Sequence, residues 1–115
     1  TEDLDLAGVL IDPVLKTAMT FAKVKALYVA ADAANLNNLS IGANVINGWA
    51  ALIGPTGASG GTITLGAGDW FFAARGRAAT AGWVVTPATG DLIHAVNLAG
   101  TNTISYTIAG IGTSA

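Results

Sequence analysis

Apolar and polar residues alternate in several short stretches of this chain, and residues 103–108 show the pattern most clearly. The apolar members are Ile104, Tyr106 and Ile108, and threonine or serine stands between them. A period of two predicts a strand with one face on a core, because successive side chains of a strand point to opposite faces. We therefore expect Ile104, Tyr106 and Ile108 to point inward.

A second apolar run at residues 91–97 precedes this strand, and residues 98–102 between the two runs are rich in turn-forming types. Two apolar runs joined by such a segment predict a β-hairpin over residues 91–112.

The longest strand candidate covers residues 20–31. Its even positions, from Ala22 to Tyr28, carry no charge, whereas Lys23 and Lys25 occupy the odd face. This pattern predicts that the even face lies on the core along its length, and that the odd face is wet at Lys23 and Lys25 but covered near Leu27 and Val29. Alanine, lysine and leucine also favour helix, but the valine and tyrosine content and the missing capping pattern favour a strand.

Short strands are predicted elsewhere, separated by segments rich in glycine, proline or asparagine. They cover residues 4–11 with a bend at Gly8, and residues 39–42, 49–53, 62–65, 69–74 and 82–85. Eight or nine short strands without a clear helix predict an all-β protein, an antiparallel β-sandwich of jelly-roll-like form. The length of 115 residues predicts a single domain over residues 1–115, with a short acidic N-terminal arm.

Charged residues make up only 10% of the chain, against about 25% in an average protein, and 23 residues are alanine. A surface with so few charges favours burial in an assembly. The net charge of −2 argues against nucleic-acid binding, and no apolar run approaches the ~20 residues that would cross a membrane. The acidic start does not resemble a secretion signal, and the absence of cysteine excludes disulfides and thiolate metal sites.

Residues suited to catalysis are sparse. His94 is the one histidine, and Asp91, three positions away on a strand, falls on the opposite face. The carboxylates are scattered without a calcium-loop pattern, and the glycines lack the lysine of a phosphate loop. We therefore expect no enzyme activity, no catalytic residue, no cofactor and no metal, and we interpret His94 as structural.

Three groups of residues are candidates for a protein interface. Arg75 and Arg77 form a pair suited to an acidic partner surface, although two solvated loop arginines would look the same. Trp70 lies beside Phe71, so one of these large rings must face away from the local core unless both sheet faces are covered. The acidic residues near the N-terminus form the third group, since a terminal segment can reach a neighbouring subunit. The full candidate set is Glu2, Asp3, Asp5, Trp70, Arg75, Arg77 and Trp83.

A series of strand motifs resembles small β-sandwich structural proteins of tailed bacteriophages, and most of all their capsid decoration, or cement, proteins. The motifs are LDLAGVLID, TFAKVKALYV, LSIGA, TITLGAGDWFFAA, AGWVVTPATGDLIHAVNL and ISYTIAGIG, in that order. The resemblance implies a homotrimer that binds the major capsid protein on the outer surface of the virion head after synthesis in the host cytoplasm. The segment 73–77 departs from the polar turn that the family often has there.

Two other functions remain open at this point. Similar sandwiches occur in phage tails and fibres, so the chain could be a tail or fibre subunit. It could also be a carbohydrate-binding module that uses Trp49, Trp70 or Trp83 as stacking platforms.

Overall fold

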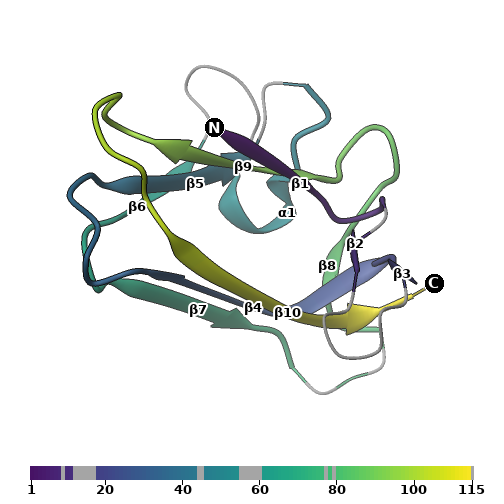
Figure 1. Cartoon of the computed structure of the whole chain (residues 1–115). Coiled ribbons are helices and arrows are strands. Elements are labelled where there is room, and N and C mark those ends of the chain that lie inside the picture. Colours follow the sequence, from purple (N-terminus) through teal and green to yellow (C-terminus); the bar gives the residue numbers. More distant parts are fainter. Residues whose placement is uncertain are drawn as a thin grey trace.

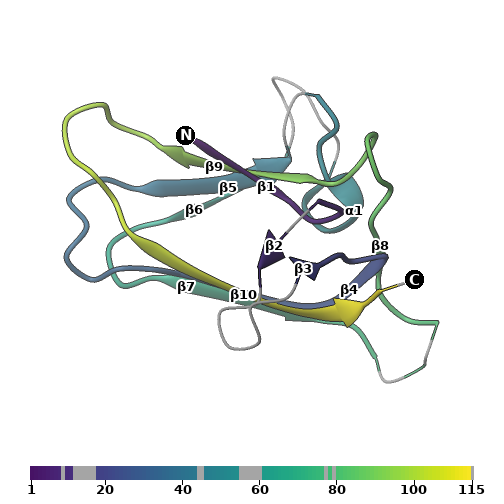
Figure 2. The same ribbon diagram turned by 45° about the vertical axis from the view of Figure 1, so that its right-hand side comes forward.

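The protein is a sandwich of two antiparallel β-sheets, seen edge-on in Figure 2. The computed structural model describes residues 1–8, 10–11, 18–43, 46–54, 61–76, 78 and 80–114. Sheet I has the strand order β1 (Glu2–Asp5), β9 (Leu92–Asn97), β5 (Leu39–Ala43) and β6 (Thr62–Leu65). Sheet II has the order β10 (Tyr106–Thr113), β4 (Lys23–Ala31) and β7 (Trp70–Ala74), and β8 (Trp83–Val84) also pairs with β4. The predicted antiparallel β-sandwich is confirmed.

Three small elements complete the described chain (Figure 1). Strands β2 (Leu10–Ile11) and β3 (Ala18–Met19) pair with each other, and α1 (Ala50–Ile53) is a single helical turn.

The predicted hairpin at residues 91–112 is wrong, because its two strands belong to different sheets. Strand β9 pairs with β1 and β5 in sheet I, whereas β10 pairs with β4 in sheet II. Residues 98–105 therefore cross from one sheet to the other, as do residues 32–38 and 66–69 at the same end of the sandwich (Figure 2). Eight residues are too long for a tight hairpin turn and long enough to span the ~10 Å between packed sheets.

The core lies between the two sheets and is built mainly from aliphatic side chains of both, together with the ring of Trp49. Its largest fully buried members are Trp49, Leu39, Ile41, Ile93, Val24 and Val29. Ile104, Tyr106 and Ile108 pack against this cluster, whereas the residues between them are exposed. The inward face predicted for residues 103–108 is therefore confirmed.

A β-bulge in β4 overturns the prediction that its even positions face the core throughout. Gly112 lies opposite Val24, but the preceding residue, Ile111, lies opposite Ala26, so Lys25 is an extra residue on β4. One extra residue reverses which positions face the core. Val24 is buried before the bulge, and after it the odd positions Leu27, Val29 and Ala31 are buried instead.

The bulge also explains the glycine at position 112. A Cβ atom there would collide with the carbonyl oxygen of Lys23 and with the Phe21 ring. The close approach of the two strands at this point therefore requires glycine.

Residues 49–53, predicted as a strand, instead place Trp49 in the core and then form α1. The indole of Trp49 is 1% exposed, and its Nε1 donates a hydrogen bond to the Val84 carbonyl oxygen at 2.9 Å. The turn ends at Gly54, whose positive φ of 102° suits glycine and whose N–H donates to the Ala50 carbonyl oxygen. Burial of one large ring fixes this segment more strongly than its strand propensity does.

The N-terminal segment pairs into sheet I from Glu2 onward, earlier than the predicted start at residue 4. Residues 2–5 pair with residues 92–95 of β9, so the expected acidic arm is an edge strand. The single strand predicted over residues 4–11 is wrong, because β1 ends at Asp5 and residues 10–11 form β2, which pairs with β3 apart from sheet I. The bend predicted at Gly8 is present, and Asp5 Oδ1 accepts hydrogen bonds there from the N–H groups of Ala7 and Gly8 at 3.0 and 2.6 Å.

Candidate interaction surface

The outer face of sheet II carries four large apolar side chains, and we call this surface the aromatic face. It consists of Tyr28 on β4, Trp70 and Phe72 on β7, and Ile111 on β10, with alanines between them. Trp70 is 66% exposed, Phe72 57% and Ile111 69%. Phe71, between the two exposed rings, packs against the core. The prediction that one ring at 70–72 faces away from the core is confirmed.

Strand register brings these side chains together. Tyr28 lies opposite Phe72 on one side and Ala109 on the other, and Ile111 lies opposite Ala26. The rings of Tyr28 and Trp70 are in contact, with centroids 6.3 Å apart and planes tilted by 37°. Three strands that are distant in sequence thus form one continuous apolar surface.

Small residues keep this surface flat between the large ones. Ala26, Ala109 and Gly110 form part of the lining of a shallow hollow of about 100 Å³ between Tyr28, Phe72 and Ile111. None of the described residues that line the hollow is ionisable at neutral pH. The aromatic face is therefore suited to excluding water against an apolar or flat partner, and it offers no group for acid–base chemistry.

Positive charges gather at the end of sheet II where β4 begins, and we call this region the basic end. Lys23 and Lys25 donate from Nζ to the carbonyl oxygens of Thr80 and Ala78, at 3.1 and 3.3 Å. The N–H of Arg75 donates to the carbonyl oxygen of Lys25 at 2.8 Å. The two lysines thus hold Ala78 and Thr80, which lie between β7 and β8, against the start of β4.

Arg75 and Trp83, both predicted interface residues, meet at this end. The Arg75 guanidinium lies 5.7 Å from the centroid of the Trp83 ring, a cation–π contact. Trp83 is half-buried and packs against the core, so it presents only part of its ring. Arg77 lies outside the described residues.

The predicted acidic group, Glu2, Asp3 and Asp5, lies along the edge strand β1 of sheet I. All three residues are exposed, yet each contacts its own chain. Asp3 and Asp5 point outward, because their neighbour Leu4 packs against the core.

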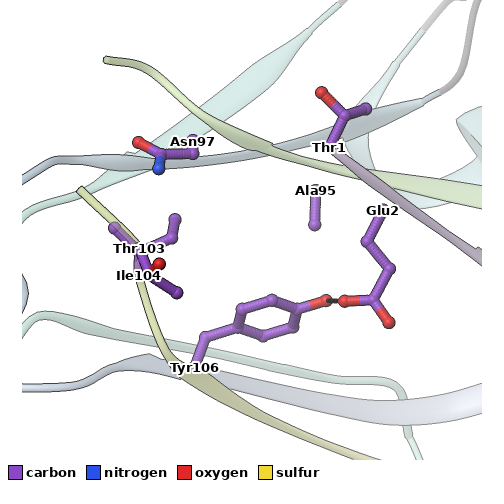
Figure 3. Close-up of a pocket in the computed structure, with 7 residues that line it drawn as sticks. All are labelled: Thr1, Glu2, Ala95, Asn97, Thr103, Ile104 and Tyr106. Carbon is purple, nitrogen blue, oxygen red and sulfur yellow. Dashed lines mark hydrogen bonds between the residues drawn. The ribbon is translucent and has the colours of Figure 1, made fainter. Parts of the chain in front are cut away.

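Glu2 instead closes a small cavity between the sheets (Figure 3). The Tyr106 hydroxyl donates a hydrogen bond to Glu2 Oε2, which ties edge strand β1 to edge strand β10. The cavity holds about 240 Å³ and is lined by Thr1, Glu2, Ala95, Asn97, Thr103, Ile104 and Tyr106. Burial, and then the bond to Glu2 and its negative charge, raise the pKa of Tyr106 well above its ordinary value.

His94 pairs with a carboxylate that spacing along the chain could not suggest. Its Nδ1 lies 2.5 Å from Asp3 Oδ1, because β1 and β9 place the two residues opposite each other. Asp91, the neighbour weighed from sequence, is buried and accepts a hydrogen bond from the Ala88 N–H at 2.7 Å. The first contact ties β1 to β9, and the second is local to the turn before β9.

Within the described ranges, no group of three or more histidine or carboxylate side chains could hold a metal ion. No helix in the described part of the chain is long and apolar enough to cross a bilayer.

Comparisons with protein-family models, curated proteins and solved structures found no match. The surface chemistry of the chain itself therefore carries the functional argument.

The structure distributes the predicted interface residues over three regions rather than one. Trp70 lies on the aromatic face, Arg75 and Trp83 lie at the basic end, and the three carboxylates lie on β1. Sequence reasoning missed Phe72, Tyr28 and Ile111. Phe72 shares its strand parity with Trp70, and Ile111 shares the parity of the outward Thr107, so both could have been found, whereas the outward position of Tyr28 depends on the bulge at Lys25.

Proposed function

We propose that this chain is a non-enzymatic virion structural protein that binds and stabilises the outer surface of a bacteriophage capsid as a decoration, or cement, protein. The observation that carries the proposal is the aromatic face, since Trp70, Phe72 and Ile111 remain largely exposed in the isolated chain. Exposed apolar patches of this kind mark interaction sites. The expected partners are further copies of the chain, as a homotrimer, and the major capsid protein.

The physical demands on a cement protein agree with this surface. A sandwich whose strands are already ordered loses little conformational entropy on binding. Apolar area contributes about 25 cal/mol per Å² when it is removed from water, and an oligomer that docks at several points gains avidity without strong single contacts.

The regions outside the aromatic face supply polar contacts. The basic end and the outward carboxylates of β1 carry opposite charges on different sheets. Rim charges of this kind set orientation and association rate more than affinity. Arg75, Asp3 and Asp5 are the described residues that we expect to orient the chain on the capsid.

Addition of the purified chain to heads that lack it tests the proposal. We expect saturable binding to heads in co-sedimentation and a higher temperature of head disruption. Exclusive co-fractionation with tails, and no binding to heads, would contradict the capsid role and favour the tail or fibre alternative.

A carbohydrate-binding function is the second candidate, and the exposure of Trp70 is the observation that favours it. Of the three tryptophans, Trp49 is excluded as a stacking platform because it is buried, and Trp83 is partly covered by Arg75. Retention of the chain on an insoluble polysaccharide, abolished by Trp70→Ala without loss of head binding, would support this second function.

A further inference from the structure

We infer that the aromatic face is covered by a second copy of this chain, in a two-fold pair whose β4 strands run antiparallel. The pairing rests on the proposed role in assembly and names the partner of the aromatic face. Two properties of sheet II select this partner, its apolar centre and the distribution of its charges, and the size of the face sets the strength of the pair.

The centre of the face is self-complementary in chemistry. Its large side chains are separated by alanines and by the shallow hollow beside Phe72 and Ile111. Ridges and hollows on one flat surface allow two copies to interdigitate when a two-fold axis relates them. Tyrosine, tryptophan and phenylalanine are also the residues enriched in the buried centres of interfaces.

The charges at the two ends of the sheet have opposite signs. Lys23 and Lys25 lie where β4 begins, whereas Asp32 follows its last residue and Asp69 precedes β7 at that same end. Both aspartates are exposed. The nine residues of β4 separate the two ends by about 30 Å.

This polarity selects one of two symmetric arrangements. A two-fold axis that lies between the two copies of sheet II and runs parallel to the strands would set the lysines of one copy over the lysines of the other. An axis that lies between the two copies of sheet II and runs perpendicular to the strands sets the lysines of each copy near the aspartates of the other. Since like charges in contact are unfavourable, the antiparallel arrangement is selected.

The size of the face sets the strength of the pair. A stable interface buries about 800 Å² on each partner, whereas three strands about 4.8 Å apart and up to 30 Å long offer less than this. We therefore expect a reversible pair with a dissociation constant in the micromolar range.

The pair leaves the other surfaces available. Arg75 at the basic end and strand β1 of sheet I lie outside the proposed contact between lysines and aspartates, so both can still contact the capsid. A trimer built through other surfaces could still pair through this face, and a closed assembly of two trimers would contain six copies. Two or six copies agree with the inference, whereas one copy or three copies at high concentration contradict it.

Sedimentation velocity over a range of concentrations measures this directly. We expect wild-type chain to shift to a paired species, and Trp70→Thr or Phe72→Thr to weaken pairing at least tenfold. Leu98→Thr is the matched control, because Leu98 is 53% exposed on a loop, close to the 57% of Phe72. Equal behaviour of all three variants would overturn the inference.

Charge reversal tests the antiparallel orientation. Lys23→Glu and Asp32→Lys should each weaken pairing severalfold, and the double variant should recover most of the loss because both ends are then inverted. If the double variant is weaker than either single variant, the antiparallel arrangement is wrong.

Single cysteines give a third measurement, since the chain has no cysteine of its own. Ala109→Cys places one thiol at the centre of the face, opposite Tyr28, and Thr64→Cys places an exposed thiol on sheet I. A short bismaleimide should link two copies through position 109 and not through position 64. Equal linking at both positions would overturn the inference.

The failure of the pairing and the failure of the proposed function are distinguishable. Wild-type chain that binds heads but never pairs would contradict the inference and leave the capsid role intact. Chain that pairs but never binds heads would contradict the capsid role and leave the inference about pairing intact. Retention of an unpaired chain on polysaccharide through Trp70 would assign the face to a glycan and overturn the inference.

Discussion

The two outer faces of the sandwich differ sharply in chemistry. The outer face of sheet I presents Asp3, Asp5, His94 and threonines of β6, whereas that of sheet II presents Trp70, Phe72 and Ile111. Both sheets contribute to the same core, so the fold alone does not require this difference. The polar face is compatible with permanent contact with water. The exposed apolar side chains of the aromatic face do not contribute to the core, so the stability of the fold does not explain why they are there.

We expect the largest loss of stability on replacement of Trp49, the buried tryptophan. Trp49→Ala should lower the free energy of unfolding by about 3–5 kcal/mol, because it leaves a large cavity and removes the hydrogen bond to Val84. Chemical denaturation followed by circular dichroism measures the loss. A loss below about 1 kcal/mol would mean that Trp49 does not anchor the core.

The link between the two sheets at Tyr106 should have an intermediate effect. Tyr106→Ala should cost about 2–3 kcal/mol, since the ring is half-buried against the core. Tyr106→Phe should cost about 1 kcal/mol, because it removes only the hydrogen bond to Glu2. Equal losses for the two variants would show that the ring itself contributes little.

The same link predicts a pH dependence at the alkaline end. The folded protein raises the pKa of Tyr106 above its ordinary value of 10.0, so it favours the neutral phenol. The stability that this provides is fully present below pH 10 and declines as the pH rises above that value. Wild type should therefore lose more stability than Tyr106→Phe between pH 9 and pH 11, and parallel profiles would contradict the assignment.

Arg75→Ala should affect docking more than folding. The loss of the contact with Trp83 should cost less than about 1 kcal/mol, whereas binding to heads should weaken several-fold. Arg75→Lys keeps the charge and serves as the control. Unchanged head binding for Arg75→Ala would remove this residue from the proposed contact.

The smallest effect on stability is expected on the aromatic face itself. Trp70→Thr should change the free energy of unfolding by no more than about 0.5 kcal/mol, because the ring is largely exposed and threonine suits a strand. Together with Trp49→Ala, this variant separates the folding role of tryptophan from its binding role. A loss of 2 kcal/mol or more would indicate that Trp70 belongs to the fold.

Local patterns predicted most strands, because alternation reflects burial on one side. The strand at residues 62–65 appears with those bounds, and the inward face of residues 103–108 is as predicted. Pairing partners could not be predicted in the same way. Whether residues 98–105 form a turn or cross between sheets depends on the whole topology.

The sequence predicted the candidate surface only on β7, where large rings occupy adjacent positions and must therefore point to opposite faces of the strand. The adjacent rings of Trp70 and Phe71 predict that one of them faces outward. The outward position of Tyr28, by contrast, depends on the extra residue Lys25 in β4. The pairs Asp3–His94 and Glu2–Tyr106 join residues 91 and 104 positions apart. The first contact follows from the register of β1 on β9 and the second from the packing of sheet I on sheet II, and no local pattern contains either.

Fluorine NMR of chain labelled with 5-fluorotryptophan tests the central claim most directly. The three tryptophans report on the core (Trp49), the basic end (Trp83) and the aromatic face (Trp70) in one experiment. We predict that the Trp70 resonance shifts and loses access to a soluble paramagnetic probe when the chain assembles, while the Trp49 resonance stays unchanged. A Trp70 resonance that remains fully accessible at every concentration and with heads present would contradict the claim that the aromatic face is an interaction surface.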